Sequence, residues 1–117
     1  YIPSSVYQET VIDCPVALQK QGILMAIGNF IQVEEPAVNH PFSRNLGQGE
    51  RGVLNLAIEK KADLLLIDDK KARNEAKALG FACSFTSDVL HYAERQQFIT
   101  SYADVMETLR GFGIYLP

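Results

Sequence analysis

The sequence predicts an α/β domain built on a mainly parallel sheet. Two short apolar runs, 64–67 and 81–85, each follow a helical pattern and lead into another. Strands that alternate with helices favour parallel pairing, because each helix carries the chain back across the sheet. A hydrophobic content of 47% in 117 residues suits one domain with its own core.

The remaining elements follow from the signals that open and close helices. Helices are expected to begin at Ser4 or Ser5 (with Ser5 and Gln8 as a capping box), at Pro15, near Glu50 and at Lys70. Two more helices are expected to be capped by Thr86 or Ser87 and by Ser101. Gly80 is expected to end the helix that begins at Lys70. Strands are expected at 1–2, 30–33, 64–67 and 81–85, with a last edge strand at 114–116. Residues 37–46 are predicted to form an irregular loop.

A glycine-rich stretch lies around the start of the third helix. Gly47, Gly49 and Gly52 spell the G-x-G-x-x-G of a dinucleotide site, and Asp68 follows about 20 residues later, where such sites place a ribose-binding acid. That fingerprint requires an apolar strand running into the first glycine, whereas residues 39–45 are a polar loop. Glu50 would also repel a pyrophosphate held in the turn. Nucleotide binding is therefore the third of our hypotheses.

Three acids near this stretch support a metal site instead. Apolar residues follow Glu50 after four, seven and eight positions, so Glu50 heads the face that packs on the core, where a charge needs a partner. Asp68 and Asp69 end the next strand, at the sheet edge where α/β proteins place functional groups. Together they would offer the oxygen ligands that magnesium or manganese prefers. The structural alternative is that Glu50 complements the helix dipole and Asp69 caps the following helix.

These residues also carry a family resemblance. Gly49-Glu50, Leu54-x-Leu56-Ala57, the run 62–73 and Ala76-x-x-Leu79-Gly80 resemble the second half of a PIN domain, most closely the small prokaryotic branch related to VapC-type toxins. Residues 1–11 resemble the family's second strand and the helix bearing its second acid, and 90–117 resemble its closing helices and strand. The resemblance implies a three-layer sandwich with a mainly parallel central sheet, spanning 1–117 as a single domain.

The resemblance further implies metal-dependent cleavage of RNA by a cluster of acids. By position, Glu9 matches the second family acid, Glu50 the third, and the Asp68-Asp69 pair the fourth. The implied catalytic residues are Glu9, Glu50 and Asp69, and the same three with Asp68 are the implied ligands of Mg²⁺ or Mn²⁺. On its helix, Glu9 stands three residues from Val6 and from Ile12, so it is expected to border an apolar stripe.

One family acid has no counterpart in the chain. It belongs to an N-terminal strand, in a segment of roughly 25 to 35 residues that would lie before Tyr1. The domain is therefore expected to be truncated at its N-terminus, with an incomplete toxin-type ribonuclease site. The alternative function is a non-catalytic PIN-like module that binds a partner. The resemblance also implies a small antitoxin as a partner, and a homodimer or higher oligomer.

Charge and cysteine content bound the setting. A net charge of −3 argues against a broadly basic surface for nucleic acid, so RNA would be gripped locally. The candidate basic rim consists of Arg44, Arg51, Lys70, Lys71 and Arg73, with a solvated helix face as the alternative for the last three. The two cysteines, 14 and 83, form no metal or redox motif, which indicates a reducing cytoplasmic setting.

Overall fold

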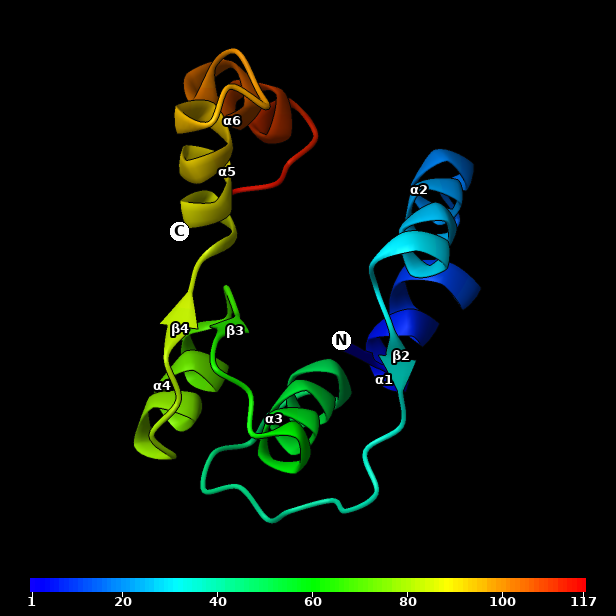
Figure 1. Ribbon diagram of the computed structural model, residues 1–117, viewed down its shortest axis with the longest axis vertical. Helices are drawn as coiled ribbons and strands as arrows, with labels where there is room; N and C mark the ends of the chain where they lie inside the picture. Colours follow the sequence, from blue (N-terminus) through cyan, green and yellow to red (C-terminus); the bar gives the residue numbers. More distant parts are fainter. The chain divides into compact units, whose positions relative to one another are not determined.

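The computed structural model describes the backbone of residues 1–117 and every side chain except those of Leu18 and Gln19. The chain forms two compact units, Tyr1–Asp63 and Leu64–Pro117, which we call unit 1 and unit 2. Each unit holds one pair of parallel strands together with helices (Figure 1). The predicted α/β class with parallel strands is therefore confirmed.

In unit 1 the two strands are joined by a helical crossover, as parallel pairing requires. β1 (Ile2–Pro3) pairs with β2 (Val33–Glu34), with Ile2 opposite Val33 and Pro3 opposite Glu34. The crossover consists of α1 (Ser4–Tyr7), the π-helical turn η1 (Gln8–Ile12) and α2 (Ala17–Asn29). A loop then leads to α3 (Gln48–Lys60). The strand expected at 30–33 is thus shorter and shifted towards Glu34.

Helix α3 forms the centre of unit 1. Leu54 is fully buried, and Leu56 and Ala57 are buried beside it. Lys61 ends the helix in the left-handed conformation, with φ of 52°. At the other end Gly52 allows a close approach of the first strand, because a Cβ at position 52 would lie only 3.0 Å from the Cβ of Pro3. The glycine therefore brings β1 and α1 against α3.

The turn η1 changes the helical register near Glu9. The N–H of Asp13 donates to the carbonyl of Gln8 at 2.9 Å, a bond to the fifth preceding residue that defines a π-turn. As a result Val11 is 3% exposed while Ile12 is 53% exposed. The expectation that Ile12 shares an apolar face with Val6 is wrong, because that spacing holds only for a regular α-helix.

In unit 2, β3 (Leu65–Leu66) pairs in parallel with β4 (Cys83–Ser84). The helices are α4 (Lys70–Ala78), α5 (Thr86–Arg95) and α6 (Tyr102–Gly111). The buried hydrophobic residues of this unit come from β3 and the residue that follows it, from α4 and from α6, namely Leu65, Ile67, Ala72, Ala76 and Met106. Small alanines on α4 let that helix bury one face completely.

Two of the predicted helix ends are confirmed, and a third is shifted by one residue. Ser101 caps α6, since its Oγ accepts from the N–H of Asp104 at 3.2 Å, and Gly80 follows α4 with φ of 91°, as predicted. The N-cap of α5 is Phe85 rather than Thr86 or Ser87, because the carboxylate of Asp88 satisfies the Phe85 N–H at 2.8 Å.

Two other expectations about the chain ends are wrong. Residue 3 is the N-cap of α1, and the Ser5 hydroxyl faces Gly52 without a hydrogen-bond partner in the described part of the chain, so no capping box forms. No strand forms at 114–116, because the N–H of Ile114 bonds to the carbonyl of Leu109 and closes the end of α6.

Among the helices described, none combines the length and the apolar content needed to cross a membrane.

Candidate functional site

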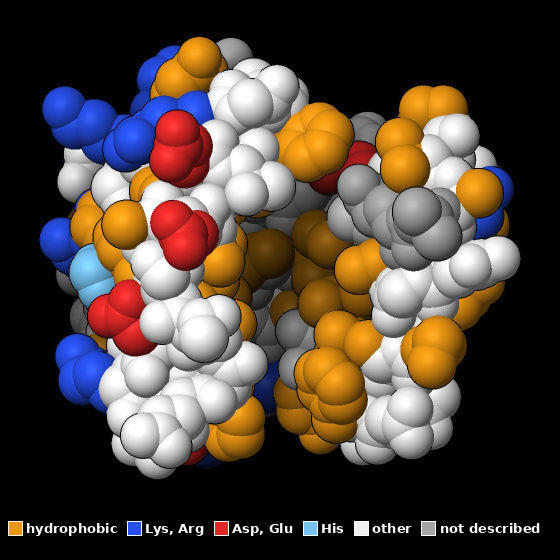
Figure 2. Space-filling view, turned by 90° about the horizontal axis from the view of Figure 1, so that it is seen from above, with side chains coloured by type: hydrophobic (Ala, Val, Ile, Leu, Met, Phe, Trp, Pro, Cys, Tyr) orange, Lys and Arg blue, Asp and Glu red, His pale blue; other side chains and the backbone are white. Residues whose placement is uncertain are grey.

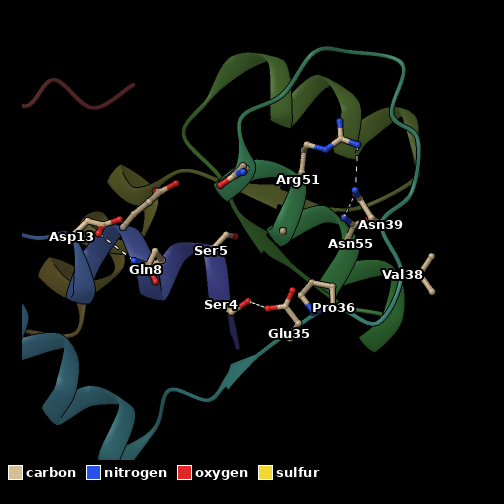
Figure 3. A pocket seen from close by; sticks show the side chains of 13 residues that line it. Ser4, Ser5, Gln8, Asp13, Glu35, Pro36, Val38, Asn39, Arg51 and Asn55 are labelled. Atoms are coloured by element: carbon tan, nitrogen blue, oxygen red, sulfur yellow. Dashed lines mark hydrogen bonds between the residues drawn. The ribbon is translucent and has the colours of Figure 1, made fainter.

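A polar hollow of about 560 Å³ lies within unit 1. Its walls come from α1, η1, the loop after β2 and the first turns of α3 (Figure 3). The charged residues lining it are Glu9, Asp13, Glu35 and Arg51. Asp13 accepts from the Gln8 side-chain amide at 3.1 Å, and Glu35 accepts from the Ser4 hydroxyl. The hollow is therefore mostly acidic, with one arginine among the side chains described.

Glu9 lies in η1 with its side chain exposed to the hollow. Its Oε1 is 2.9 Å from the position that a Cβ on Gly49 would occupy. The carboxylate therefore rests directly on the backbone of the first turn of α3. Within the described residues it receives no hydrogen bond or ion pair, so its oxygens remain available to a ligand.

Glu50 approaches the same helical turn from within α3. Its Oε2 lies 2.5 Å from the position of a Cβ on Gly47, the N-cap residue of the helix. The side chain is partly buried and folds back over the helix N-terminus, where a negative charge is favoured. Glu50 is therefore placed to complement the helix dipole, as the structural alternative expects. Its carboxylate also lies at the turn of α3 that Glu9 contacts.

Asp68 and Asp69 follow β3 in unit 2, and each has a backbone partner. Asp68 accepts from the N–H of Thr86 at 2.8 Å, which ties the end of β3 to the start of α5. Asp69 is the N-cap of α4 and accepts through Oδ2 from the N–H of Ala72 at 2.9 Å. The predicted cap is confirmed, and one oxygen of Asp69 remains outside it.

The predicted acids are distributed over both units. In unit 1 Glu9 approaches Gly49 and Glu50 approaches Gly47, both at the start of α3, and in unit 2 Asp68 and Asp69 are consecutive. Within each unit as described, no three acidic, histidine or cysteine side chains form a group able to hold a metal ion. Each unit by itself therefore offers a pair of carboxylates.

Arg51 is the rim residue that lines the hollow. Its Nη2 donates to Oδ1 of Asn39 at 3.4 Å (Figure 3). The same nitrogen donates to the carbonyl of His40 at 3.2 Å, and the guanidinium lies 5.4 Å from the ring centre of Phe42. The side-chain amide of Asn55 donates to the same Oδ1 of Asn39 at 3.0 Å. The loop after β2 therefore fixes Arg51 at the hollow.

The other rim residues have different surroundings. Lys70 and Lys71 are exposed on the first turn of α4, as the alternative of a solvated helix face expects. Arg73 stacks on Phe85, with 3.5 Å between the guanidinium carbon and the ring centre. Arg44 is partly buried and engaged in an interaction. Of the five, Arg51 alone belongs to the hollow among the residues that the structure describes.

The glycines of the G-x-G-x-x-G stretch have a packing role. Glu50 occupies the space beside Gly47, Glu9 the space beside Gly49, and Pro3 and Ser5 the space beside Gly52. The described residues 35–47 contain no strand, so the fingerprint lacks the context that nucleotide binding requires. These glycines allow side chains of the same chain to approach α3.

Sequence reasoning missed two residues that organise the hollow, Asn39 and Asn55. Asn55 is 5% exposed, and its Oδ1 accepts from the N–H of His40 at 2.9 Å. The available signal was a single polar residue between Leu54 and Leu56, inside an otherwise apolar stretch. A buried amide needs partners, but the sequence does not say that a loop fifteen residues earlier supplies them.

A family model described as a PIN domain matches residues 1–117. No curated protein and no solved structure matches the chain.

Proposed function

Since the chain belongs to the PIN domain family, we propose that it hydrolyses phosphodiester bonds in RNA with the help of a magnesium or manganese ion. The family indicates nuclease-type activity, an RNA substrate and use of divalent metal ions. The proposal adds the reaction and the residues that perform it.

The observation that carries the proposal is the pair of carboxylates at the first turn of α3. Glu9 and Glu50 approach adjacent parts of that turn, and neither receives a protein donor among the residues described. Their donor set is all oxygen, which suits a hard divalent cation. Magnesium is commonly held by one or two carboxylates together with substrate phosphates and water. The residues present therefore fit the metal that the family uses.

We assign the following roles to residues of the chain. Glu9 and Glu50, in unit 1, hold the metal. Asp68 and Asp69, in unit 2, are proposed as metal ligands only by their positional match to the family's fourth acid. When bound, the divalent ion supplies Lewis acidity and a more acidic water for attack on phosphorus. Asp69 keeps α4 in place with one oxygen and has the other for this role.

The finer assignments are a toxin of the VapC-related branch, a small antitoxin as partner, and a homodimer or higher oligomer. Large hydrophobic side chains at the surface support association with another protein. Phe30 in unit 1 is 80% exposed and Phe98 in unit 2 is 77% exposed, and Figure 2 shows hydrophobic side chains on one face together with charged ones. Contiguous apolar patches commonly mark protein contacts, and we propose Phe30 and Phe98 as contact residues on their respective units.

The test is manganese-dependent cleavage of a panel of single-stranded RNAs by the protein as its gene encodes it. We expect cleavage that EDTA abolishes and that Glu50→Gln strongly reduces. Glu107→Gln, an exposed acid on α6, is the matched control. Folded protein that binds RNA or a protein partner without cleaving any RNA would favour the non-catalytic module.

A further inference from the structure

We propose that the side chain of Arg51 is preorganised to bind a phosphate of the RNA backbone, and that Asn39 and Asn55 are its positioning residues. This inference rests on the proposed function, because it takes the substrate to be a polyanion. It adds the group that grips this substrate in the hollow of unit 1.

The positioning begins with the buried amide of Asn55. Its Oδ1 accepts from the N–H of His40 at 2.9 Å, and its Nδ2 donates to Oδ1 of Asn39 at 3.0 Å. A buried amide with both ends satisfied has a fixed orientation, since turning it over would set donor against donor. Asn55 therefore fixes both the loop backbone at His40 and the side-chain oxygen of Asn39.

That oxygen and the His40 carbonyl then hold Arg51. Both accept from Nη2, at 3.4 Å and 3.2 Å, while the ring of Phe42 lies beside the guanidinium. A guanidinium has five N–H donors, so donors remain for a ligand. Each of these partners is neutral, so the network orients the arginine without neutralising its charge.

The surroundings select the ligand. A planar guanidinium with free donors matches the paired oxygens of a phosphate. The other charged groups lining the hollow are the carboxylates of Glu9, Asp13 and Glu35, which repel an anion. A phosphate in this hollow is therefore attracted to Arg51, and the chain of the RNA extends from there towards Glu9. The hollow therefore holds both the proposed phosphate-binding arginine, Arg51, and one of the proposed metal ligands, Glu9.

The first test measures the affinity for a short single-stranded RNA, in the presence of calcium ions, as a function of salt concentration. Arg51→Gln keeps a neutral donor towards Asn39 but removes the charge. We expect affinity to fall about tenfold and the slope of log K against log salt to shrink by about 0.7, the value for one phosphate contact on a single strand. Arg95→Gln, an exposed arginine on α5, is the control and should change neither quantity.

A second variant separates recognition from a merely structural role. Asn39→Asp retains the Oδ1 acceptor for Arg51 and Asn55 but places a negative charge against the guanidinium. We expect it to weaken RNA binding as much as Arg51→Gln while thermal stability is kept. If Arg51 serves only to hold the loop, the added negative charge should hold that loop at least as firmly, and the RNA affinity should be unchanged.

The outcomes distinguish this inference from the proposed function. If Glu50→Gln abolishes cleavage but Arg51→Gln binds RNA like the Arg95→Gln control, the nuclease stands and the role of Arg51 is overturned. If cleavage does not depend on Glu50 but the salt slope still falls with Arg51→Gln, the phosphate contact stands and the proposed chemistry is overturned. Unchanged slope in both Arg51→Gln and Asn39→Asp also overturns the inference.

Discussion

The carboxylate of Glu9 occupies the space beside Gly49 that a side chain at position 49 would fill. Oε1 of Glu9 lies 2.9 Å from the site of a Cβ there, closer than real Cβ atoms come to their neighbours. Gly47 makes room for Glu50 in the same way, at 2.5 Å. Each carboxylate thus reaches the start of α3 because the glycine beside it has no side chain.

We therefore expect Gly49→Ala to reduce manganese affinity and RNA cleavage, each about tenfold. The added methyl group displaces the Glu9 carboxylate, which lies at the end of a flexible side chain, so the fold should survive. Alanine also favours the helix by about 1 kcal/mol over glycine. Calorimetric titration with Mn²⁺ and thermal unfolding would measure the two effects separately.

Gly22→Ala is the matched control for that variant. Gly22 lies within α2, and a Cβ there would meet nothing within 4 Å. It should stabilise the chain by about 0.5–1 kcal/mol without changing cleavage. Equal activity of the two alanine variants would show that the space beside Gly49 does not matter for the site.

Removing the charge of either glutamate should impair the metal site directly. Glu9→Gln and Glu50→Gln keep side-chain length but replace an anionic ligand with a neutral amide. We expect each to lower kcat/KM at least about 100-fold, which corresponds to about 2.7 kcal/mol of transition-state stabilisation. Manganese titration of both variants provides the check, and wild-type affinity in both would rule out this pair as ligands.

At Asp69 the cap and the charge can be separated by choice of substitution. Asp69→Asn retains an oxygen that accepts from the Ala72 N–H, so stability should change little. Asp69→Ala removes the cap and should cost about 1 kcal/mol in the free energy of unfolding. Cleavage should fall in both variants if the charge serves the metal. Activity that instead follows stability would leave Asp69 as a cap alone.

The start of α5 predicts a pH dependence of stability. The Phe85 N–H and the Ser84 hydroxyl donate to Asp88 and hold the pKa of its carboxyl below the usual range. The ionised form is thus favoured by folding, and its contribution is present above the ordinary aspartate pKa of about 3.9. It is lost as the pH falls through that value and on through the lower pKa of the folded state.

Asp88→Asn should therefore flatten the pH dependence of stability below about pH 4, while retaining an oxygen that accepts from Phe85. Urea unfolding at a series of pH values would measure this. An NMR titration would give the pKa of Asp88 itself, and an ordinary or raised value would contradict the assignment.

Local patterns were enough to predict much of the fold. The apolar spacing behind Glu50 gave α3, and Gly80 and Ser101 marked helix ends by backbone and capping chemistry that a few neighbouring residues determine. The N-cap of α5 was displaced by one residue because the Asp88 carboxylate reaches back over the turn. The strand expected at 114–116 failed because β-propensity says nothing of a partner, and α6 used the Ile114 N–H instead.

The site was predictable to a different degree. Position in a family pattern selected Glu9 and Glu50, and the structure sets both at one turn of α3. The network through Asn39 and Asn55 was not predictable, because it joins a loop to a helix through contacts that leave no periodic signal. The packing role of the three glycines was hidden for the same reason, since only the folded chain shows which side chains fill the space beside them.

The π-turn at 8–12 determines how a homologue with one residue fewer in this helix would align with the chain. A π-turn is a wider turn within a helix, so removing one residue from it would restore regular α-helical spacing. The wider turn therefore absorbs one residue, and the helical segments on either side would keep their faces after such a deletion. A homologue one residue shorter here would carry its acid on the same face, and its alignment needs a single gap inside an otherwise continuous helix.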